Sequence, residues 1–373
     1  MKQVRAVDLR KDLKTFIDFP HELYKKDPHY VPELYVGQRD LLTPGKHPFH
    51  NHSKVQLFLA YDGERVTGRI AAILNNNHNA FNHAQDGFFG FFDCIDDQET
   101  ANMLIGAASE WLKARGAKTL IGPANFSTNE TVGLLIEGFD LPPVVMMPYN
   151  APYYLRLLEN AGLKKKTDLF AYYVSYKNLN DRSVRLLNTL QERLKRNHIV
   201  IRKINMKKFK EEAEKLREVY NQAWDKNLGF VPMTEEEFDH MAKEMKQVLN
   251  PEFCLIAEQE GKFIGLALGV PDINQVLIRI KRGRLLPFGI FKLLTGMKKI
   301  NQLRVLILGV VEGYRKLGIE ACLYGTIIKN GVNHHIKGAE CSWMLEDNYM
   351  MNHAIEQING ELYKKYRLLE KAI

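Results

Sequence analysis

The feature that most constrains the fold is a succession of expected elements that occurs twice along the chain. Apolar runs, turn residues and helical periodicity predict a hairpin, a strand, a helix, a strand, a helix and a strand in the first half. These elements cover residues 56–74, 87–95, 97–116, 118–126, 152–162 and 168–176. The same order is predicted again over residues 253–270, 303–311, 321–336, 339–345, 348–359 and 362–371.

Two short landmarks fix the correspondence between the halves. Gly116-Ala117 precedes a strand that ends near Asn125. In the same way, Gly338-Ala339 precedes a strand that ends near Asn348. Any α/β chain repeats some elements by chance, but the ordered match of several elements favours a duplication.

We therefore expect two α/β domains. The length of 373 residues exceeds that of a typical single domain. The duplication predicts a first domain over 1–178, a linker helix over 179–199 and a second domain over 200–373. The second domain is expected to carry an insertion at 276–300.

Composition places the chain among ordinary folded proteins. Hydrophobic residues make up 45% and charged residues 26% of it, as in globular proteins. The first residues contain no apolar signal core, and no stretch reaches the ~18 apolar residues of a spanning helix. The cysteines are scattered and show neither a metal-binding nor a disulfide spacing: Cys94, Cys254, Cys322 and Cys341. The sequence predicts a cytoplasmic protein with reduced cysteines.

A basic and apolar segment at 279–300 stands out from this background. It holds seven of the cations behind the net charge of +8 and no anion: Arg279, Lys281, Arg282, Arg284, Lys292, Lys298 and Lys299. Pro287, Gly289 and Gly296 interrupt it, so it is expected to form a loop and a short amphipathic helix between two strands.

Two partners fit this segment. In the first interpretation it lies peripherally on an anionic membrane, where Arg282 and Arg284 meet headgroups and Phe288 and Phe291 enter the bilayer interface. In the second it is a basic flap that docks a carrier protein, with its apolar side packed on the first domain. Nucleic acid is not expected as a partner, because the cations are mixed with Leu, Phe and Ile rather than laid out as a recognition helix.

The motif that carries chemistry follows the strand 303–311. It is the turn Arg315-Lys316-Leu317-Gly318-Ile319-Glu320-Ala321 at the start of a helix. A helix N-terminus offers unpaired backbone N–H groups and partial positive charge, and Gly318 lets the backbone come close to an anion.

This turn and its setting resemble the GNAT superfamily of N-acyltransferases over most of 200–373. The resemblance implies two tandem GNAT-like domains, each with a mixed, mostly antiparallel sheet flanked by helices. It also implies acyl-CoA or acetyl-CoA as donor substrate, with an acyl carrier protein as an alternative donor. The donor would be held by the following residues: Leu308, Val310, Arg315, Lys316, Leu317, Gly318, Ile319 and Ala321.

Two departures limit the donor site. Glu320 stands where the family pattern has a small residue, and it either opposes a diphosphate or points outward and favours the helix start. The first half has no such turn, since Asp96, Asp97 and Glu99 occupy the start of its helix. Acidic side chains there repel phosphate. We expect one donor site, in the second half.

The catalytic groups are less clearly marked. The family often uses a tyrosine at the position of Ile355 in this chain, so that residue is missing. Tyr349, Tyr363 and Tyr366 are nearby substitutes for it, Glu346 is the candidate base, and Asn348 is a further candidate catalytic residue. Glu346 is equally consistent with a surface carboxylate before a helix. No metal is expected, because no cluster of His, Cys and acidic residues has a ligand spacing.

The acceptor side is expected to involve both halves. In the second half, Trp224 and Asn227 lie on the helix and loop that cover the acceptor mouth in this architecture, although Trp224 is also consistent with packing alone. In the first half, Asn125 and Ser127 belong to the polar run GPANFSTNE. Their side chains either bind the acceptor or cap turns.

The whole chain resembles the bacterial ceramide synthase branch of this superfamily. The segments that carry this resemblance are LLPFG, GPANFSTNE and SWMLEDN. It implies transfer of a long fatty acyl chain to the amine of a sphingoid base. Two alternatives stay open, namely a small-molecule N-acetyltransferase that uses acetyl-CoA and a catalytically inactive GNAT-like binding protein.

Overall fold

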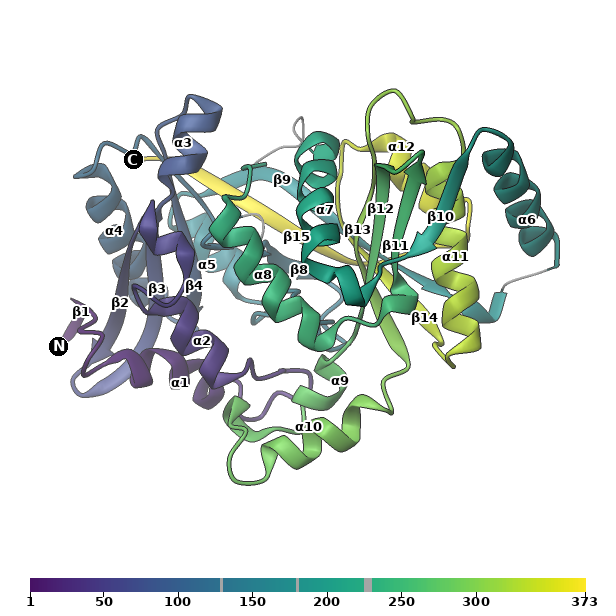
Figure 1. The fold of residues 1–373 in the computed structure, drawn as a ribbon. Coiled ribbons are helices and arrows are strands. Elements are labelled where there is room, and N and C mark those ends of the chain that lie inside the picture. The colour runs from purple at the N-terminus through teal and green to yellow at the C-terminus, as the bar shows by residue number, and fades with distance from the viewer. Residues whose placement is uncertain (128–129, 179–180, 225–229) are drawn as a thin grey trace. The chain divides into compact units, whose positions relative to one another are not determined.

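The chain forms two compact α/β units. The computed structural model describes residues 1–127, 130–178, 181–224 and 230–373 (Figure 1). The first unit consists of Met1–Phe170, Asn274–Lys298 and Lys364–Ile373, and the second of Ala171–Ile273 and Lys299–Tyr363. Each unit has a mostly antiparallel sheet flanked by helices, which confirms the predicted fold class. The domain boundaries inferred from the duplication stay a prediction.

The sheet of the first unit contains the hairpin predicted at 56–74. Its order is β1 (Lys2–Ala6), β2 (Lys54–Asp62), β3 (Arg65–Leu74), β4 (Asp86–Cys94), β5 (Thr119–Gly122) and the end of β15 (Glu361–Ala372), with β8 (Leu134–Glu137) also on β15. β4 and β5 are parallel, and the pairs β1–β2, β2–β3, β3–β4, β5–β15 and β8–β15 are antiparallel. The predicted hairpin at 56–74 is confirmed.

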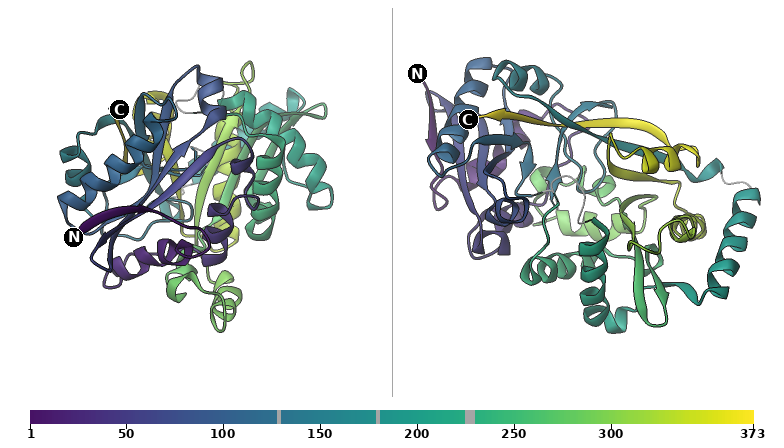
Figure 2. Two further views of the ribbon diagram at one scale, coloured as in Figure 1. Left: turned by 90° about the vertical axis from the view of Figure 1, so that its left-hand side faces the viewer. Right: turned by 90° about the horizontal axis from the view of Figure 1, so that it is seen from above.

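Helices cover both faces of this sheet. A Cβ atom added at Gly68 would lie 2.7 Å from Leu104 of α4 (Gln98–Lys113). The next residue, Arg69, donates from Nη1 to the Phe16 carbonyl of α1 (Leu13–Leu23) at 2.9 Å. Because neighbouring residues of a strand face opposite sides, α4 and α1 lie on opposite faces (Figure 2).

Shorter elements complete the first unit. They are α2 (Tyr35–Leu42), η1 (Pro48–Asn51), α3 (Asn76–Asn82), β6 (Ala124–Asn125), β7 (Thr131–Val132), α5 (Tyr154–Asn160), the start of β9 (Lys164–Ser175), α9 (Asn274–Leu277), η5 (Lys281–Gly283) and α10 (Gly289–Met297). The predicted strand 118–126 is divided into β5 and β6, because Pro123 has no N–H to donate to a ladder. The loop and short helix predicted for 279–300 are confirmed as η5 and α10.

The second unit repeats this plan. Its sheet has the order β14 (Gly338–Leu345), β13 (Gln302–Val310), β12 (Lys262–Pro271), β11 (Cys254–Gln259) and β10 (Ile199–Lys203). The pair β13–β14 is parallel and the other three are antiparallel. Around it lie η2 (Tyr176–Asn178), α6 (Asp181–Arg196), η3 (Met206–Lys208), α7 (Phe209–Trp224), α8 (Glu235–Val248), η4 (Pro251–Phe253), α11 (Ile319–Asn333) and α12 (Tyr349–Glu356).

Local signals in this half correspond to local geometry. The β11–β12 turn has positive φ at Glu260 (51°) and Gly261 (83°), as tight hairpins prefer. The predicted capping box is confirmed, because the Thr234 N–H donates to Glu237 Oε2 at 2.9 Å and the Glu237 N–H to Thr234 Oγ1 at 3.2 Å.

The predicted linker helix is part of the second unit rather than a free connector. α6 packs on α11, where a Cβ atom added at Gly325 would lie 2.7 Å from Leu187. β10 follows α6 and pairs with β11 from Ile199 to Lys203. The sequence analysis placed residue 199 in the linker and predicted no strand here.

Two further findings concern the chain as a whole. Cys94, Cys254, Cys322 and Cys341 are all buried and free. Within the described residues, no helix has both the length and the apolar character needed to cross a bilayer.

Candidate active site

The central strands of the second unit part from one another like a fork. β13 and β14 pair in parallel from Gln302 and Gly338 as far as Val305 and Cys341. Beyond this point β13 continues to Val310 and β14 to Leu345 without further pairs between them among the described residues. The divergence, which we call the second fork, opens a space inside the sheet.

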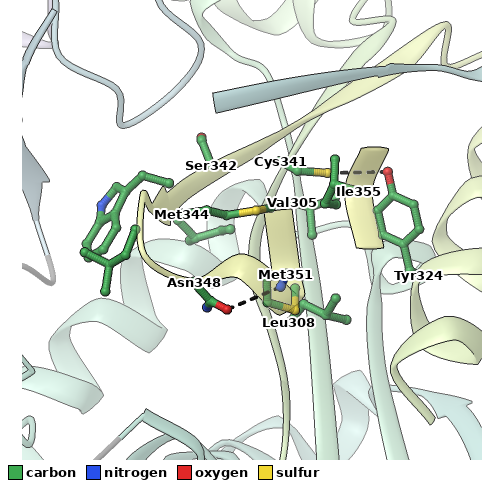
Figure 3. Close-up of a pocket in the computed structure, with 12 residues that line it drawn as sticks. Val305, Leu308, Tyr324, Cys341, Ser342, Met344, Asn348, Met351 and Ile355 are labelled. Atoms are coloured by element: carbon green, nitrogen blue, oxygen red, sulfur yellow. Dashed lines mark hydrogen bonds between the residues drawn. The ribbon is translucent and has the colours of Figure 1, made fainter. Parts of the chain in front are cut away.

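A cavity of about 120 Å³ occupies the second fork (Figure 3). Side chains from both strands, from α11, and from α12 and its N-cap residue line it. They are Val305, Leu306, Leu308, Tyr324, Cys341, Ser342, Trp343, Met344, Leu345, Asn348, Met351 and Ile355. Most of these residues are apolar, while polar and apolar atoms contribute about equally to the surface of the cavity.

A β-bulge lies beside this cavity. Leu268 of β12 pairs with Ile307, whereas the next residue, Gly269, pairs with Val305. Leu306 is therefore the extra residue of β13, and it lies just past the last β13–β14 pair. A bulge residue is left out of the ladder, so its backbone groups are available to a bound molecule.

The predicted donor turn connects the fork to α11. Gly318 adopts φ of 88° and Lys316 φ of 67°. The Arg315 Nε–H donates to the Val310 carbonyl at 3.1 Å, which ties the turn to the end of β13. Arg315 and Lys316 are exposed, and no side chain among the described residues caps α11 at Gly318. First-turn N–H groups next to two cations attract anions in general, and the donor site at this turn stays a prediction.

The other predicted donor residues contribute differently. Leu308 lines the cavity, whereas Val310 and Ile319 are buried and do not line it. Ala321 is exposed in the first turn of α11, and Glu320 is half-buried beside it.

Two buried groups near the closed end of the fork were not predicted. The Tyr324 hydroxyl lies 3.4 Å from Cys341 Sγ (Figure 3). Burial raises the pKa of Tyr324 well above its usual value and raises the pKa of Cys341 to about 12. Both groups stay protonated near neutral pH. Sequence analysis offered no signal for them, because a Tyr in an apolar helix and a Cys in an apolar strand are typical of a core.

A buried polar network joins β13 and β14 and includes Ser342, which also lines the cavity. Arg304 Nε–H donates to Ser342 Oγ at 3.0 Å, and the hydroxyls of Ser342 and Tyr363 both donate to the carboxylate of Glu340. Glu340 is 0% exposed, and it is paired in register with Arg304. Glu340 and Ser342, two residues apart within an otherwise apolar strand, were a sequence signal that the analysis missed.

The three predicted catalytic residues lie together where β14 leads into α12, but only one of them lines the cavity. Asn348 lines the cavity and caps α12, where its Oδ1 accepts the Met351 N–H at 3.3 Å. Glu346 is half-buried in the turn after β14. Tyr349 is 79% exposed and is not among the cavity-lining residues. Ile355, which takes the place of the family tyrosine, does line the cavity.

The predicted acceptor residues fall in several places. Trp224 is the last residue of α7, and Asn227 lies outside the described residues. Asn125 and Ser127 belong to the first unit, and Ser127 is half-buried. Their role toward an acceptor stays a prediction. Within the described part of the chain, no three His, Cys, Asp or Glu side chains form a group that would hold a metal ion.

The corresponding strands of the first unit also part, and we call this the first fork. β4 and β5 pair in parallel only from Asp86 and Thr119 to Phe88 and Ile121. The chain then fills the opening itself, because Asn125 of β6 accepts the Phe91 N–H at 2.8 Å through Oδ1.

Comparison with known proteins identifies the family. Protein YghO of Escherichia coli is 36% identical over 376 positions, which cover 99% of this chain and 95% of that protein. The bacterial ceramide synthase of Caulobacter vibrioides is also 36% identical over 376 positions, which cover 97% of this chain and 95% of that protein. No family model matches the sequence.

Solved structures show the same fold. A tandem GNAT protein from the clavulanic acid biosynthesis pathway matches 100% of this chain and 98% of its own, with a TM-score of 0.60 and 12% identity. A GCN5-related N-acetyltransferase from Sphaerobacter thermophilus matches with a TM-score of 0.55 and 13% identity, over 100% of this chain and 95% of its own. The chain therefore has the fold of a tandem GNAT protein, and it belongs to the family that includes protein YghO and the bacterial ceramide synthase of Caulobacter vibrioides.

Proposed function

We propose that the protein transfers an acyl group from an acyl thioester, carried by CoA or by an acyl carrier protein, to the amine of a lipid such as a sphingoid base. The observation that carries the donor part is the second fork, which opens a cavity between β13 and β14, in the unit where α11 begins at Gly318 with no described side chain capping it. The family relationship and the name of the relative from Caulobacter vibrioides support the acceptor part.

Two parts of the donor would contact different residues. The pantetheine arm and the start of the acyl chain would lie in the cavity against Leu308 and Met351, which offer apolar contacts. The phosphate would meet the first-turn N–H groups of α11, with Arg315 and Lys316 nearby. Glu320 weakens the attraction for a diphosphate, which suits the single phosphodiester of a carrier protein as well as CoA.

Transfer of an acyl group from a thioester to an amine needs a base for the amine, a group that polarises the carbonyl, and a proton for the leaving thiolate. The amine nitrogen attacks the thioester carbonyl, the C–S bond breaks, one proton leaves the nitrogen and one proton reaches the thiolate. We assign the first proton to Glu346, after the end of β14, and the second to the Tyr349 hydroxyl in the first turn of α12, with Asn348 as a further polar group beside them. The Leu306 N–H in the bulge is our candidate for polarising the carbonyl oxygen, because the ladder leaves this residue unpaired with β12.

The acceptor side has a simple physical requirement. A sphingoid base has a long hydrocarbon chain and one amine, so its site must combine apolar wall with a few polar groups. Trp224, Asn227, Asn125 and Ser127 are our candidates for such contacts.

A two-by-two assay of donors and acceptors tests the proposal. The purified protein would be incubated with acetyl-CoA or palmitoyl-CoA, and with sphinganine or the polar amine spermidine, and the products identified by mass spectrometry. We expect N-palmitoyl sphinganine as the main product. Exclusive acetylation of spermidine would reject the lipid acceptor, and a lack of product in all four mixtures, repeated with an acyl carrier protein donor, would reject the enzyme activity.

Hydrogen exchange locates the donor site independently of turnover. Palmitoyl-CoA should slow amide exchange across 308–321 in the second unit and leave 88–99 in the first unit unchanged. Equal protection of both segments, or protection of neither, would contradict a single donor site at the second fork.

A further inference from the structure

The basic segment between β12 and β13 is fastened to the first unit by two of its own cations. Arg284 donates from Nη2 to both carboxylate oxygens of Asp18, at 2.8 and 2.9 Å, and its guanidinium lies 3.3 Å above the ring of Tyr35. Arg282 forms an ion pair with Glu22. These arginines therefore hold the segment against α1 and α2, which differs from the headgroup contacts that the sequence analysis expected of them.

Glycines let α10 lie close to the protein on its inner side. A Cβ atom added at Gly289 would lie 2.2 Å from the Arg284 carbonyl oxygen, and one added at Gly296 would lie 2.6 Å from Val276 of α9. The two glycines are seven residues apart, which places them on the same helix face. The inner face of α10 is thus packed through its backbone.

The bulky apolar side chains point the other way. Exposed fractions are 79% for Leu286, 72% for Phe288, 65% for Phe291 and 63% for Leu294. We call these four residues the apolar face. Figure 1 shows α10 beside α1 and α2, at the outer side of the unit, and Figure 2 shows the same placement from another direction. Large apolar side chains gathered at this exposure mark a binding surface.

The charges around the apolar face select its partner. Lys292, Lys298 and Lys299 are exposed next to it, and residues 273–300 contain no Asp or Glu. We propose that α10 docks on an anionic lipid surface, with the apolar face in the acyl boundary and the lysines at the headgroups. A second copy of the chain fits less well, because a symmetric contact would bring these lysines against their own equivalents.

This membrane contact goes beyond the proposed acyl transfer and does not depend on it. Binding to lipid requires neither donor nor acceptor, so it can be measured when both are absent. A protein that acylates amines but ignores vesicles, or the reverse, would separate the two proposals.

Vesicle co-sedimentation tests the contact. The full chain should bind phosphatidylglycerol/phosphatidylcholine vesicles at low salt, bind less at high salt, and bind pure phosphatidylcholine vesicles weakly. Phe288→Ser with Phe291→Ser should lower partitioning by about ten-fold or more. Lys292→Gln, Lys298→Gln and Lys299→Gln together should flatten the salt dependence.

A matched double variant controls for lost surface hydrophobicity. Phe81 and Leu141 are also apolar, exposed by 44% and 47%, and belong to the first unit. Phe81→Ser with Leu141→Ser should bind vesicles like the wild type, and circular dichroism would show that both double variants fold. Wild-type protein that does not bind anionic vesicles, or equal binding by the Phe288/Phe291 variant, would overturn the proposal. A dimer that Phe288→Ser with Phe291→Ser dissociates in the absence of vesicles would replace the membrane by a second copy.

Discussion

The two forks of this protein begin alike and end differently. Both arise where a parallel strand pair stops, at Phe88 and Ile121 in the first unit and at Val305 and Cys341 in the second. In the first, the chain crosses the opening, and a Cβ atom added at Gly90 would lie 2.2 Å from the Ala124 carbonyl oxygen. In the second, the opening stays as a cavity.

The helices that follow the forks differ in the same sense. α4 is capped by Asp97, whose carboxylate accepts the Thr100 N–H at 2.8 Å and binds Lys2. The hydrogen bond from Lys2, followed by that from Thr100, holds the pKa of Asp97 at about 2. α11 begins instead at Gly318, and no described side chain caps it. In the first unit the chain itself thus satisfies the strand gap and the helix start, whereas in the second unit no described side chain closes either of them.

The largest expected effect comes from filling the second fork as the first is filled. Leu308→Trp puts a large ring into the cavity, and we expect kcat/KM for palmitoyl transfer to fall about 100-fold, which corresponds to ~2.7 kcal/mol of transition-state binding. Ile307→Trp is the matched control, since Ile307 leaves the strand on the opposite face. Similar losses in both variants would show that the cavity is not the donor site.

The next effect tests whether Asn125 closes the first fork. Asn125→Ala leaves the Phe91 N–H without its acceptor and should lower the free energy of unfolding by about 1–3 kcal/mol. Thermal unfolding and faster exchange of the Phe91 amide would measure it, and Asn125→Asp should restore much of the loss, because it keeps an acceptor oxygen. Unchanged stability and exchange in Asn125→Ala would mean that the fork is closed by packing alone.

A pair of glycines separates backbone strain from donor binding. Gly318 and Gly116 have φ of 88° and 87°, so alanine at either position should cost about 1 kcal/mol of stability. Only Gly318→Ala should also weaken binding of palmitoyl-CoA, by about five-fold, because its Cβ alters the anion turn. An added Cβ at Gly116 meets no described atom within 4 Å, which makes that variant the reference. Equal donor affinities in a titration would remove Gly318 from the site.

The smallest effect concerns the charge at the start of α11. Glu320→Gln removes the carboxylate from the first turn, and we expect CoA to bind about two- to five-fold more tightly, in line with ~0.3–1 kcal/mol for a charge near a helix end. The gain should shrink as salt rises. Weaker binding after this substitution would mean that Glu320 supports the donor site rather than opposing phosphate.

Much of this fold follows from local patterns in the sequence. The hairpins, the capping box at Thr234 and the helix start at Gly318 depend on residues that are neighbours along the chain, so periodicity and turn chemistry predict them. The donor turn was also predictable, because its cations and glycine stand together at 315–318. The charges and the helix-breaking residues of 279–300 also indicated an exposed segment.

The tertiary structure decided what these segments meet. Whether a strand gap is open or filled depends on residues far apart in sequence, such as Phe91 and Asn125, or Val305 and Cys341. In the sequence Tyr324 and Cys341 are typical core residues, and only the structure shows that both line one cavity. In the sequence Arg282 and Arg284 are candidates for headgroup contacts. In the structure Arg282 pairs with Glu22 and Arg284 with Asp18, each more than two hundred positions earlier in the chain. Periodicity reports which face of an element is apolar, whereas the partner of that face is set by long-range packing that no local pattern encodes.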